Sequence, residues 1–306
     1  MGAHHARVYR ELPGVRLAGV CDVDEVAAER VAERHGTEAM SRPALLAAAD
    51  VVSVVVPTAY HYETAMACIS ADVDLLVEKP FVDDLDAGRE LDRRAREAGV
   101  TLQVGHIERF NPATRVLADI VADLEIVAID IDRLGPPVDR GGTDSVVMDL
   151  MVHDLDILLS LVDSDIISLS ATARDAGHTA VQLQFADRSI ASLTASRLTQ
   201  QKIRTLSVTA LSCRVNVDFI RQTVEIHRRS VPEYIESNGD IRYRHESVVE
   251  HPIVKNGEPL KAELSAFVDA ARNGTEPVVT AADGLAVLEL AEEIEELALS
   301  PPVVSQ

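Results

Sequence analysis

A short apolar run that leads directly into Glu78, Lys79 and Pro80 is the feature that most constrains this sequence. Residues 75–77 read Leu-Leu-Val, and helical patterns precede them at residues 61–71 and follow them at residues 85–98. An apolar run between two helices is typical of a buried strand in a parallel sheet. Ligands bind at the carboxyl ends of strands in open α/β sheets. We therefore predict that Lys79 lies over a ligand cleft, with an ordinary charged turn as the alternative.

Strands and helices alternate through the first hundred residues. Apolar or β-branched runs predict strands at residues 15–22, 51–56, 75–78 and 101–105, and the segments around them predict helices at residues 4–12, 24–35, 43–49, 61–71 and 85–98. Such alternation is typical of an α/β fold. We predict a Rossmann-like, doubly wound parallel sheet at residues 1–106.

The pattern changes after Gly105, because strand-like runs now follow one another with few helices between them. The runs lie at residues 126–133, 166–174, 179–185, 190–196, 203–210, 213–218 and 223–228, with a Gly/Pro-rich loop through residue 142 and helical patterns at 111–123, 146–162, 260–272 and 281–299. Consecutive strands of this kind favour antiparallel pairing. We predict an α+β domain with a mixed, mostly antiparallel sheet at residues 107–306.

Charge and composition exclude several classes of partner. The chain has 50 acidic and 29 basic residues, hence a net charge of −21, which repels nucleic acid and anionic membranes. No apolar run approaches the roughly 20 residues of a membrane span. Lysine occurs only at positions 79, 202, 255 and 261, and this composition suits a high-salt, halophilic cytoplasm. The three scattered cysteines give no disulfide or zinc spacing, so we expect a cytoplasmic protein without bound metal.

Asp149 and His153 are four residues apart in the predicted helix 146–162 and therefore share one of its faces. An acid beside an imidazole raises its basicity and orients its tautomer. This is how a general base is assembled. A routine ion pair on a solvated helix face is the alternative.

The start of the chain contains part of a dinucleotide-binding pattern. That pattern has Gly-x-Gly-x-x-Gly between a strand and a helix, with an acid about 20 residues further on. Gly2 fits the third glycine and Asp22 fits the acid, which favours NAD because it repels the 2′-phosphate of NADP. The preceding strand and two glycines are absent, and their loss would leave buried backbone groups unpaired. We expect that the natural chain starts about a dozen residues earlier and that these 306 residues bind NAD poorly.

Together these features resemble the Gfo/Idh/MocA family of NAD(P)-dependent oxidoreductases over nearly the whole chain. The resemblance is carried by Met1-Gly2 with His5-Ala6, by Asp22, by Val56-Pro57-Thr58 with His61, by Glu78-Lys79-Pro80, and by Asp149 with His153. It implies that Lys79, Asp149 and His153 form the catalytic group. It also implies NAD binding by Gly2, His5, Asp22, Pro57, Thr58, His61, Glu78, Lys79 and Pro80, a cis bond between Lys79 and Pro80, and a homo-oligomer (dimer or tetramer) formed through the open face of the second domain's sheet.

Within the family, residues 105–112, 133–136 and 153–156 are similar to the UDP-N-acetylglucosamine 3-dehydrogenase branch. This similarity implies an NAD-dependent oxidation at C3 of a sugar nucleotide, bound by Lys79, Arg109, Asn111, Asp149 and His153. Asn111 also fits a helix N-cap before Pro112, and the two roles are compatible. The alternatives are a dehydrogenase of a free polyol, inositol or UDP-sugar acid on the same fold, and a non-catalytic NAD-binding regulator.

Overall fold

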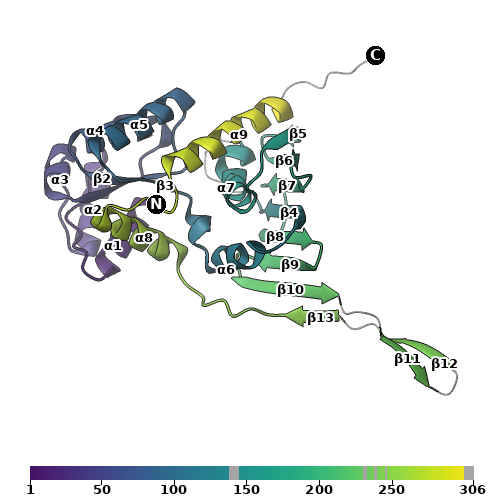
Figure 1. Ribbon diagram of the computed structural model, residues 1–306. Helices are drawn as coiled ribbons and strands as arrows, with labels where there is room; N and C mark the ends of the chain where they lie inside the picture. Colours follow the sequence, from purple (N-terminus) through teal and green to yellow (C-terminus); the bar gives the residue numbers. More distant parts are fainter. Residues whose placement is uncertain (138–144, 230–232, 238–239, 245–246, 300–306) are drawn as a thin grey trace, which may run out of the picture. The chain divides into compact units, whose positions relative to one another are not determined.

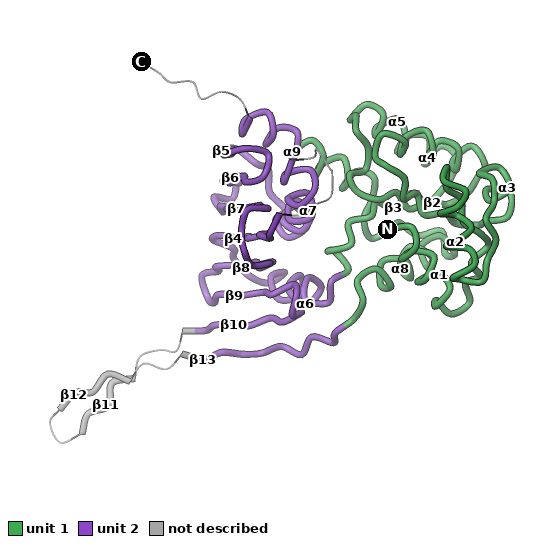
Figure 2. Tube along the Cα trace, turned by 180° about the vertical axis from the view of Figure 1, so that it is seen from behind, with its two compact units in different colours: residues 1–110, 257–289 green, residues 111–256, 290–306 purple. Residues whose placement is uncertain are grey.

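The computed structural model describes residues 1–137, 145–229, 233–237, 240–244 and 247–299, and the predicted loop through residue 142 lies partly outside them. The chain forms two compact units, drawn in different colours in Figure 2. Unit 1 contains Met1–Phe110 and Gly257–Glu289, and unit 2 contains Asn111–Asn256 and Leu290–Gln306. None of the described helices is long and apolar enough to cross a membrane.

Unit 1 is built on a parallel sheet with the strand order β1-β2-β3, flanked by helices (Figure 1). In register, Leu76 of β2 is paired with Ser53 of β1 and with Gln103 of β3. The elements are α1 (Gly2–Glu11), α2 (Glu25–His35), α3 (Arg42–Ala48), β1 (Val51–Val54), a 3₁₀ turn (Thr58–Tyr60), α4 (His61–Ser70), β2 (Asp74–Glu78), α5 (Leu85–Ala98), β3 (Leu102–Gly105), a second 3₁₀ turn (Ile107–Phe110) and α8 (Pro259–Asn273). The Rossmann-like parallel sheet predicted from the alternating pattern is confirmed.

The strand predicted at residues 15–22 is wrong. Only an isolated bridge forms there, between Val20 and Ala39. It consists of hydrogen bonds from the Val20 N–H to the Glu38 oxygen (3.0 Å) and from the Met40 N–H to the Val20 oxygen (2.8 Å). A strand needs a neighbouring strand to satisfy its backbone groups, and β1 is hydrogen-bonded only to β2 in the described part of the chain. The apolar pattern of the segment therefore does not produce a ladder.

The apolar faces of α1 and α8 form one core against the central strand of unit 1. Val8 and Leu12 of α1, Leu76 of β2, and Leu264 and Phe267 of α8 belong to one cluster of buried side chains. This packing explains why α8 lies in unit 1 although its sequence position is within the predicted second domain. The predicted boundary near residue 106 would place α8 in the second domain, apart from the strand β2 against which it packs.

Unit 2 contains an eight-stranded sheet with the order β13-β10-β9-β8-β4-β7-β6-β5. β4 and β7 are parallel, and every other pair in this sheet is antiparallel, which confirms the mixed sheet predicted from the sequence. The strands are β4 (Ile126–Leu134), β5 (Ile166–Asp175), β6 (His178–Phe185), β7 (Ile190–Ser196), β8 (Ile203–Ala210), β9 (Cys213–Asp218), β10 (Thr223–Arg229) and β13 (Ser247–Glu250). A separate pair, β11 (Glu233–Ser237) and β12 (Asp240–Arg244), and β13 were not predicted.

Two helices of unit 2, α6 (Pro112–Val121) and α7 (Val152–Leu161), cover one face of this sheet, as Figure 1 shows. The residues of β4 alternate accordingly, so that Ile129 and Ile131 are buried toward the helices while Asp130 and Asp132 are exposed on the open face. The last helix, α9 (Ala281–Leu299), contributes residues to both units.

Candidate functional site

The Glu78-Lys79-Pro80 turn follows β2 at the carboxyl end of the parallel sheet, and its Lys79–Pro80 peptide bond is cis, as the family resemblance implied. The Glu78 carboxylate is buried and forms hydrogen bonds with a side chain of α1 and with the backbone of its own turn. Its Oε1 atom lies 2.9 Å from His5 Nε2 of α1, and its Oε2 atom accepts a hydrogen bond from the Lys79 backbone N–H at 3.3 Å. His5 therefore contacts the turn through Glu78.

Gly105 of β3 makes room for this carboxylate. It is paired with Glu78 across the sheet. A Cβ atom at position 105 would lie 3.0 Å from the Glu78 Cα atom and 3.2 Å from its carboxylate. Such contacts are too close to form without a shift of the turn. A glycine opposite Glu78 thus avoids a tight contact with the turn.

His61, at the start of α4, holds the same turn from another direction. Its ring is 1% exposed, and Nδ1 lies 2.9 Å from the Pro80 oxygen and 3.2 Å from the Phe81 oxygen. Its Nε2 atom lies 2.9 Å from the Val56 oxygen, after β1. His61 therefore connects the chain segments that leave β1 and β2.

The N-terminal end of helix α1 has the properties of a binding site for an anionic group. It begins at Gly2 with no side-chain cap and no acidic residue in its first turn. Its unsatisfied N–H groups and positive dipole end thus favour a phosphate. Tyr9 anchors the helix to the sheet through a 2.7 Å hydrogen bond to Ser53, and burial raises the pKa of the Tyr9 phenol. The helix end is therefore suited to a phosphate group, and its contact with the pyrophosphate of a dinucleotide stays a prediction.

The other predicted cofactor residues of unit 1 lie at exposed or half-exposed positions after strand-like segments. Asp22 is exposed, and its Oδ1 atom accepts the Asp24 N–H at 3.0 Å, which fixes its orientation. Pro57 is exposed and Thr58 is half-buried, both directly after β1. An oriented, accessible carboxylate has the chemistry needed to accept hydrogen bonds from ribose hydroxyls. Contacts of these residues with a cofactor stay a prediction.

In unit 2 a buried ion pair fixes the helix that carries His153. Arg133 is on the helix-covered face of β4, and its Nε atom donates to both carboxylate oxygens of Asp154, at 2.9 and 2.8 Å. Both side chains are almost fully buried. Asp154 is adjacent to His153 in the first turn of α7, so this contact fixes the position of the half-buried His153 on the sheet.

Asp149 lies in a π-helical turn, Val147–Met151, that precedes α7. The sequence predicts one continuous α-helix here, whereas the structure has a wider turn before α7; single π-helical turns are frequent at functional sites. Arg197, just after β7, donates from Nη2 to Asp149 Oδ2 at 2.5 Å. The predicted pairing of Asp149 with His153, and the joint action of both with Lys79 of unit 1, stay predictions.

Two residues predicted to bind the sugar nucleotide differ in their surroundings. Asn111 is buried; its Oδ1 atom accepts the Ala113 N–H at 3.1 Å, and its Nδ2 atom donates to the Phe219 oxygen at 3.1 Å. It thus caps α6, with Pro112 at the first helical position, and joins the helix to the loop after β9. Arg109 is half-buried in the 3₁₀ turn before Asn111. Their roles toward a substrate stay predictions.

Sequence reasoning missed the roles of Arg133 and Arg197. Arg133 occupies the third inward position of β4 after Ile129 and Ile131, where the period of two predicts an apolar residue. A charged residue at an inward position indicates that a buried residue of opposite charge lies next to it, and the sequence could have predicted such a partner for Arg133. Arg197 gave no comparable signal, because it lies just beyond the end of a strand, where a charged residue is ordinary.

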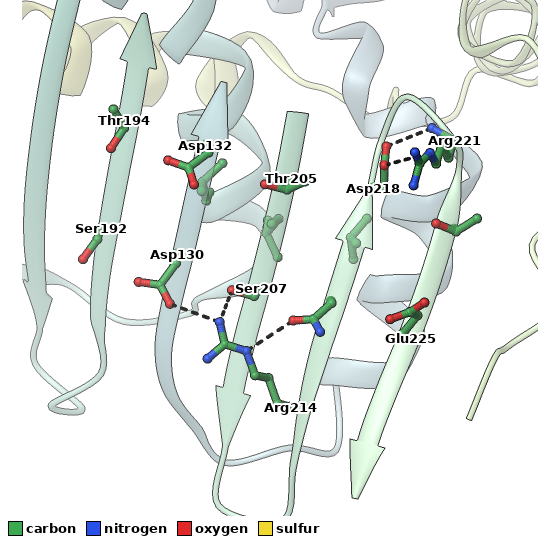
Figure 3. Close-up of a pocket in the computed structure, with 15 residues that line it drawn as sticks. Asp130, Asp132, Ser192, Thr194, Thr205, Ser207, Arg214, Asp218, Arg221 and Glu225 are labelled. Carbon is green, nitrogen blue, oxygen red and sulfur yellow. Dashed lines mark hydrogen bonds and ion pairs between the residues drawn. The ribbon is translucent and has the colours of Figure 1, made fainter. Parts of the chain in front are cut away.

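A shallow polar hollow of about 680 Å³ lies on the open face of the eight-stranded sheet (Figure 3). Side chains from several strands line it, including Asp130, Thr194, Ser207 and Arg214; Arg214 donates to Ser207 and lies near Asp130. Arg133 and the other inward residues of β4 are on the opposite face. The hollow is therefore on the face of the sheet opposite to Arg133 and to α7, the helix that carries His153. No group of three or more potential metal ligands is found among the described residues.

The chain is similar to known oxidoreductases in sequence and in fold. Residues 1–106 match an oxidoreductase family with an NAD-binding Rossmann fold, Gfo/Idh/MocA. The UDP-N-acetylglucosamine 3-dehydrogenase of Acidithiobacillus ferrooxidans is 33% identical over 235 residues, which cover 75% of this chain and 74% of that protein. Its crystal structure superposes with a TM-score of 0.87 at 28% identity and covers 97% of this chain and 94% of that chain.

A second relative extends the match along the chain. The inositol 2-dehydrogenase of Rhizobium meliloti is 27% identical over 314 residues, which cover 95% of this chain and 92% of that protein. The fold, the cis Lys79–Pro80 turn and these relatives lead to one assignment: the chain belongs to the Gfo/Idh/MocA family of NAD-dependent oxidoreductases.

Proposed function

We propose that this protein oxidises a ring hydroxyl of a sugar nucleotide, at C3 of UDP-N-acetylglucosamine, with NAD as the oxidant. The observation that carries the proposal is the 33% identity, over three quarters of each chain, to a UDP-N-acetylglucosamine 3-dehydrogenase. The similarity of residues 105–112 and 133–136 to the same branch supports it. The predicted catalytic types, a lysine, an aspartate and a histidine, argue against a purely regulatory role.

The chemistry assigns one task to each of three residues. His153 takes the proton of the substrate hydroxyl as a general base. Asp149, four residues earlier, orients His153. Lys79 donates a hydrogen bond to the same oxygen and stabilises its developing negative charge. The cofactor would supply the hydride acceptor, and the substrate would lose its ring C–H hydrogen as hydride and its O–H proton to His153 to give a ketone.

The residues that surround Lys79 support its role. Glu78 holds the backbone N–H of Lys79, while His61 holds the carbonyl of Pro80, so the turn is fixed on both sides of the lysine. A catalytic group must be held close to its productive geometry. Held in this way, the backbone at Lys79 can direct the ammonium group toward one oxygen.

An inositol dehydrogenase is the second candidate, because the inositol 2-dehydrogenase of Rhizobium meliloti matches 95% of this chain. The two substrates differ in charge: a nucleoside diphosphate sugar is a dianion, and inositol is neutral. The acid-free segment from Arg188 to Val217, in a chain with a net charge of −21, favours the anionic substrate.

The decisive experiment is incubation of the protein with NAD and either UDP-N-acetylglucosamine or myo-inositol, followed by the absorbance of NADH. We expect turnover with the sugar nucleotide and at least a hundredfold lower kcat/KM with inositol. A preference for inositol would replace the proposed substrate by the second candidate. Absence of turnover with both, in a preparation that binds NAD, would favour a regulator.

We further propose that the protein is a cytoplasmic homo-oligomer, a dimer or tetramer, adapted to high salt. The open face of the eight-stranded sheet is the expected interface, and its rows of Asp, Ser, Thr and Arg side chains suit polar contacts between copies. The net charge of −21 with four lysines supports the high-salt setting. Sedimentation at 0.1 M and 2 M KCl tests both points.

A further inference from the structure

Basic side chains are concentrated in one segment of this acidic chain. Between Arg188 and Val217 the sequence has no aspartate or glutamate, and it contains five basic residues: Arg188, Arg197, Lys202, Arg204 and Arg214. The net charge of −21 repels an anionic substrate over the molecule as a whole. A site for an anion on such a protein needs a local excess of positive charge, so the basic residues of this segment are candidates for one.

Two of these cations, Arg197 and Arg204, are on the helix-covered side of the sheet in unit 2. Arg204 of β8 is directly opposite Arg133 of β4. Opposed residues of an antiparallel pair have their side chains on the same face, and Arg133 donates to Asp154 on α7. Arg197 contacts the π-helical turn before α7 through Asp149. Both cations are therefore on the side of the sheet where α7 lies.

These two arginines flank β4 from opposite sides. The strand order β8-β4-β7 places Arg204 on one neighbour of β4 and Arg197 just past the end of the other (Figure 1). Adjacent strands are about 4.8 Å apart, so the two backbones are separated by roughly 10 Å across β4. Two long side chains can reach one diphosphate group from such positions, and guanidinium groups bind phosphate oxygens in pairs.

We propose that Arg197 and Arg204, with Lys202 just before β8, form the subsite for the diphosphate of the substrate. This inference rests on the proposed function, because it requires a sugar nucleotide. Arg133 has a different task, since its guanidinium fixes Asp154 and thereby α7. The contact between Arg197 and Asp149 connects the diphosphate subsite to the predicted catalytic turn.

The test measures binding of UDP by titration calorimetry, in the presence of NAD, to the full-length wild type and to Arg204→Gln and Arg197→Gln. A hydrogen bond to a charged group contributes enough that we expect the Kd for UDP to rise about tenfold or more in each variant. Arg188→Gln is the matched control: it removes the same charge from the same acid-free segment, but at the exposed hairpin turn between β6 and β7. Its Kd should change less than twofold.

If either arginine variant unfolds, Lys202→Gln replaces it in the test, because Lys202 is exposed. We expect this variant to raise the Kd for UDP by a smaller factor, about threefold. Wild-type affinity for UDP in both arginine variants would overturn the subsite, even if the enzyme oxidises UDP-N-acetylglucosamine. Conversely, an enzyme that binds UDP through these arginines but oxidises only inositol would retain the subsite and overturn the proposed substrate. The two failures are thus distinguishable.

Discussion

The turn at Lys79 and the turn at Asp149 are held in different ways. In unit 1 the buried side chains of Glu78 and His61 form hydrogen bonds with backbone groups on either side of the Lys79 side chain. In unit 2 an arginine contacts the Asp149 side chain directly, and Asp149 is about 43% exposed. The first arrangement fixes the backbone at Lys79 but does not fix the rotamer of its long side chain. The second fixes the carboxylate itself.

This difference predicts where substitutions act. A change near Lys79 should move the backbone and so affect the reaction without changing any charge at the substrate. A change near Asp149 should alter charge or orientation at the reacting group.

His153→Ala should cause the largest loss, because it removes the proposed general base. We expect kcat to fall by about 10²–10⁴-fold with a small change in KM. Asp149→Asn should lower kcat less, since it disturbs orientation and leaves the imidazole in place. Steady-state kinetics with both substrates measures these effects, and His251→Ala, at an exposed histidine, is the control. Near-normal turnover of His153→Ala would remove His153 from this role.

Asp154→Ala should be the most destabilising of these substitutions, because it leaves the Arg133 guanidinium buried without its carboxylate. Breaking one half of a buried ion pair costs roughly 3–5 kcal/mol. The exposed pair Arg42–Glu63 provides the control, and Glu63→Ala should change the free energy of unfolding by at most about 1 kcal/mol. Urea denaturation measures both. Equal effects would show that burial of the Arg133–Asp154 pair carries no special weight.

Gly105→Ala should displace Glu78, because the new Cβ would lie 3.0 Å from the Glu78 Cα atom. Overpacking of this kind costs about 1–3 kcal/mol, and the moved turn should also lower kcat. Gly135→Ala is the control, since a Cβ there meets no atom within 4 Å. Unfolding and kinetics are measured on both variants. A Gly105→Ala enzyme with wild-type kcat would indicate that the turn tolerates movement.

His61→Gln should act through Lys79, because an amide has only one donor end and cannot donate to the carbonyls on both sides. We expect kcat/KM to fall on the order of 10-fold or more. In a Lys79→Met background the same substitution should have little further effect. A double-mutant cycle measures this coupling. Additive losses in the cycle would mean that His61 stabilises the fold without positioning Lys79.

Asp22→Ser should have the smallest effect on catalysis and should change cofactor choice instead. The carboxylate repels the 2′-phosphate of NADP, so its removal should relax the preference for NAD. The ratio of kcat/KM for the two cofactors is the measurement, and Asp24→Ser, at the N-cap of α2, controls for the loss of an acid nearby. A wild-type enzyme that prefers NADP would contradict the assignment of Asp22.

The sequence by itself determined most of the order of elements, apart from the segment at residues 15–22 and strands β11 to β13, and it determined the change from a parallel to a mixed sheet. These follow from local patterns: the apolar run before Glu78, the period of two in β4, and the glycine after α2 are readable within a few residues. The sequence also indicated the cis Lys79–Pro80 bond, through the family resemblance.

Only the tertiary structure decided which side chains hold the site. The contact of His5 with Glu78 joins residues 73 positions apart, and that of Arg197 with Asp149 joins residues 48 positions apart. The apolar segment at residues 15–22 forms no strand, because ladder formation depends on a neighbour and not on local pattern. Local patterns fix a residue's preference for a conformation, whereas its partner depends on how distant segments pack.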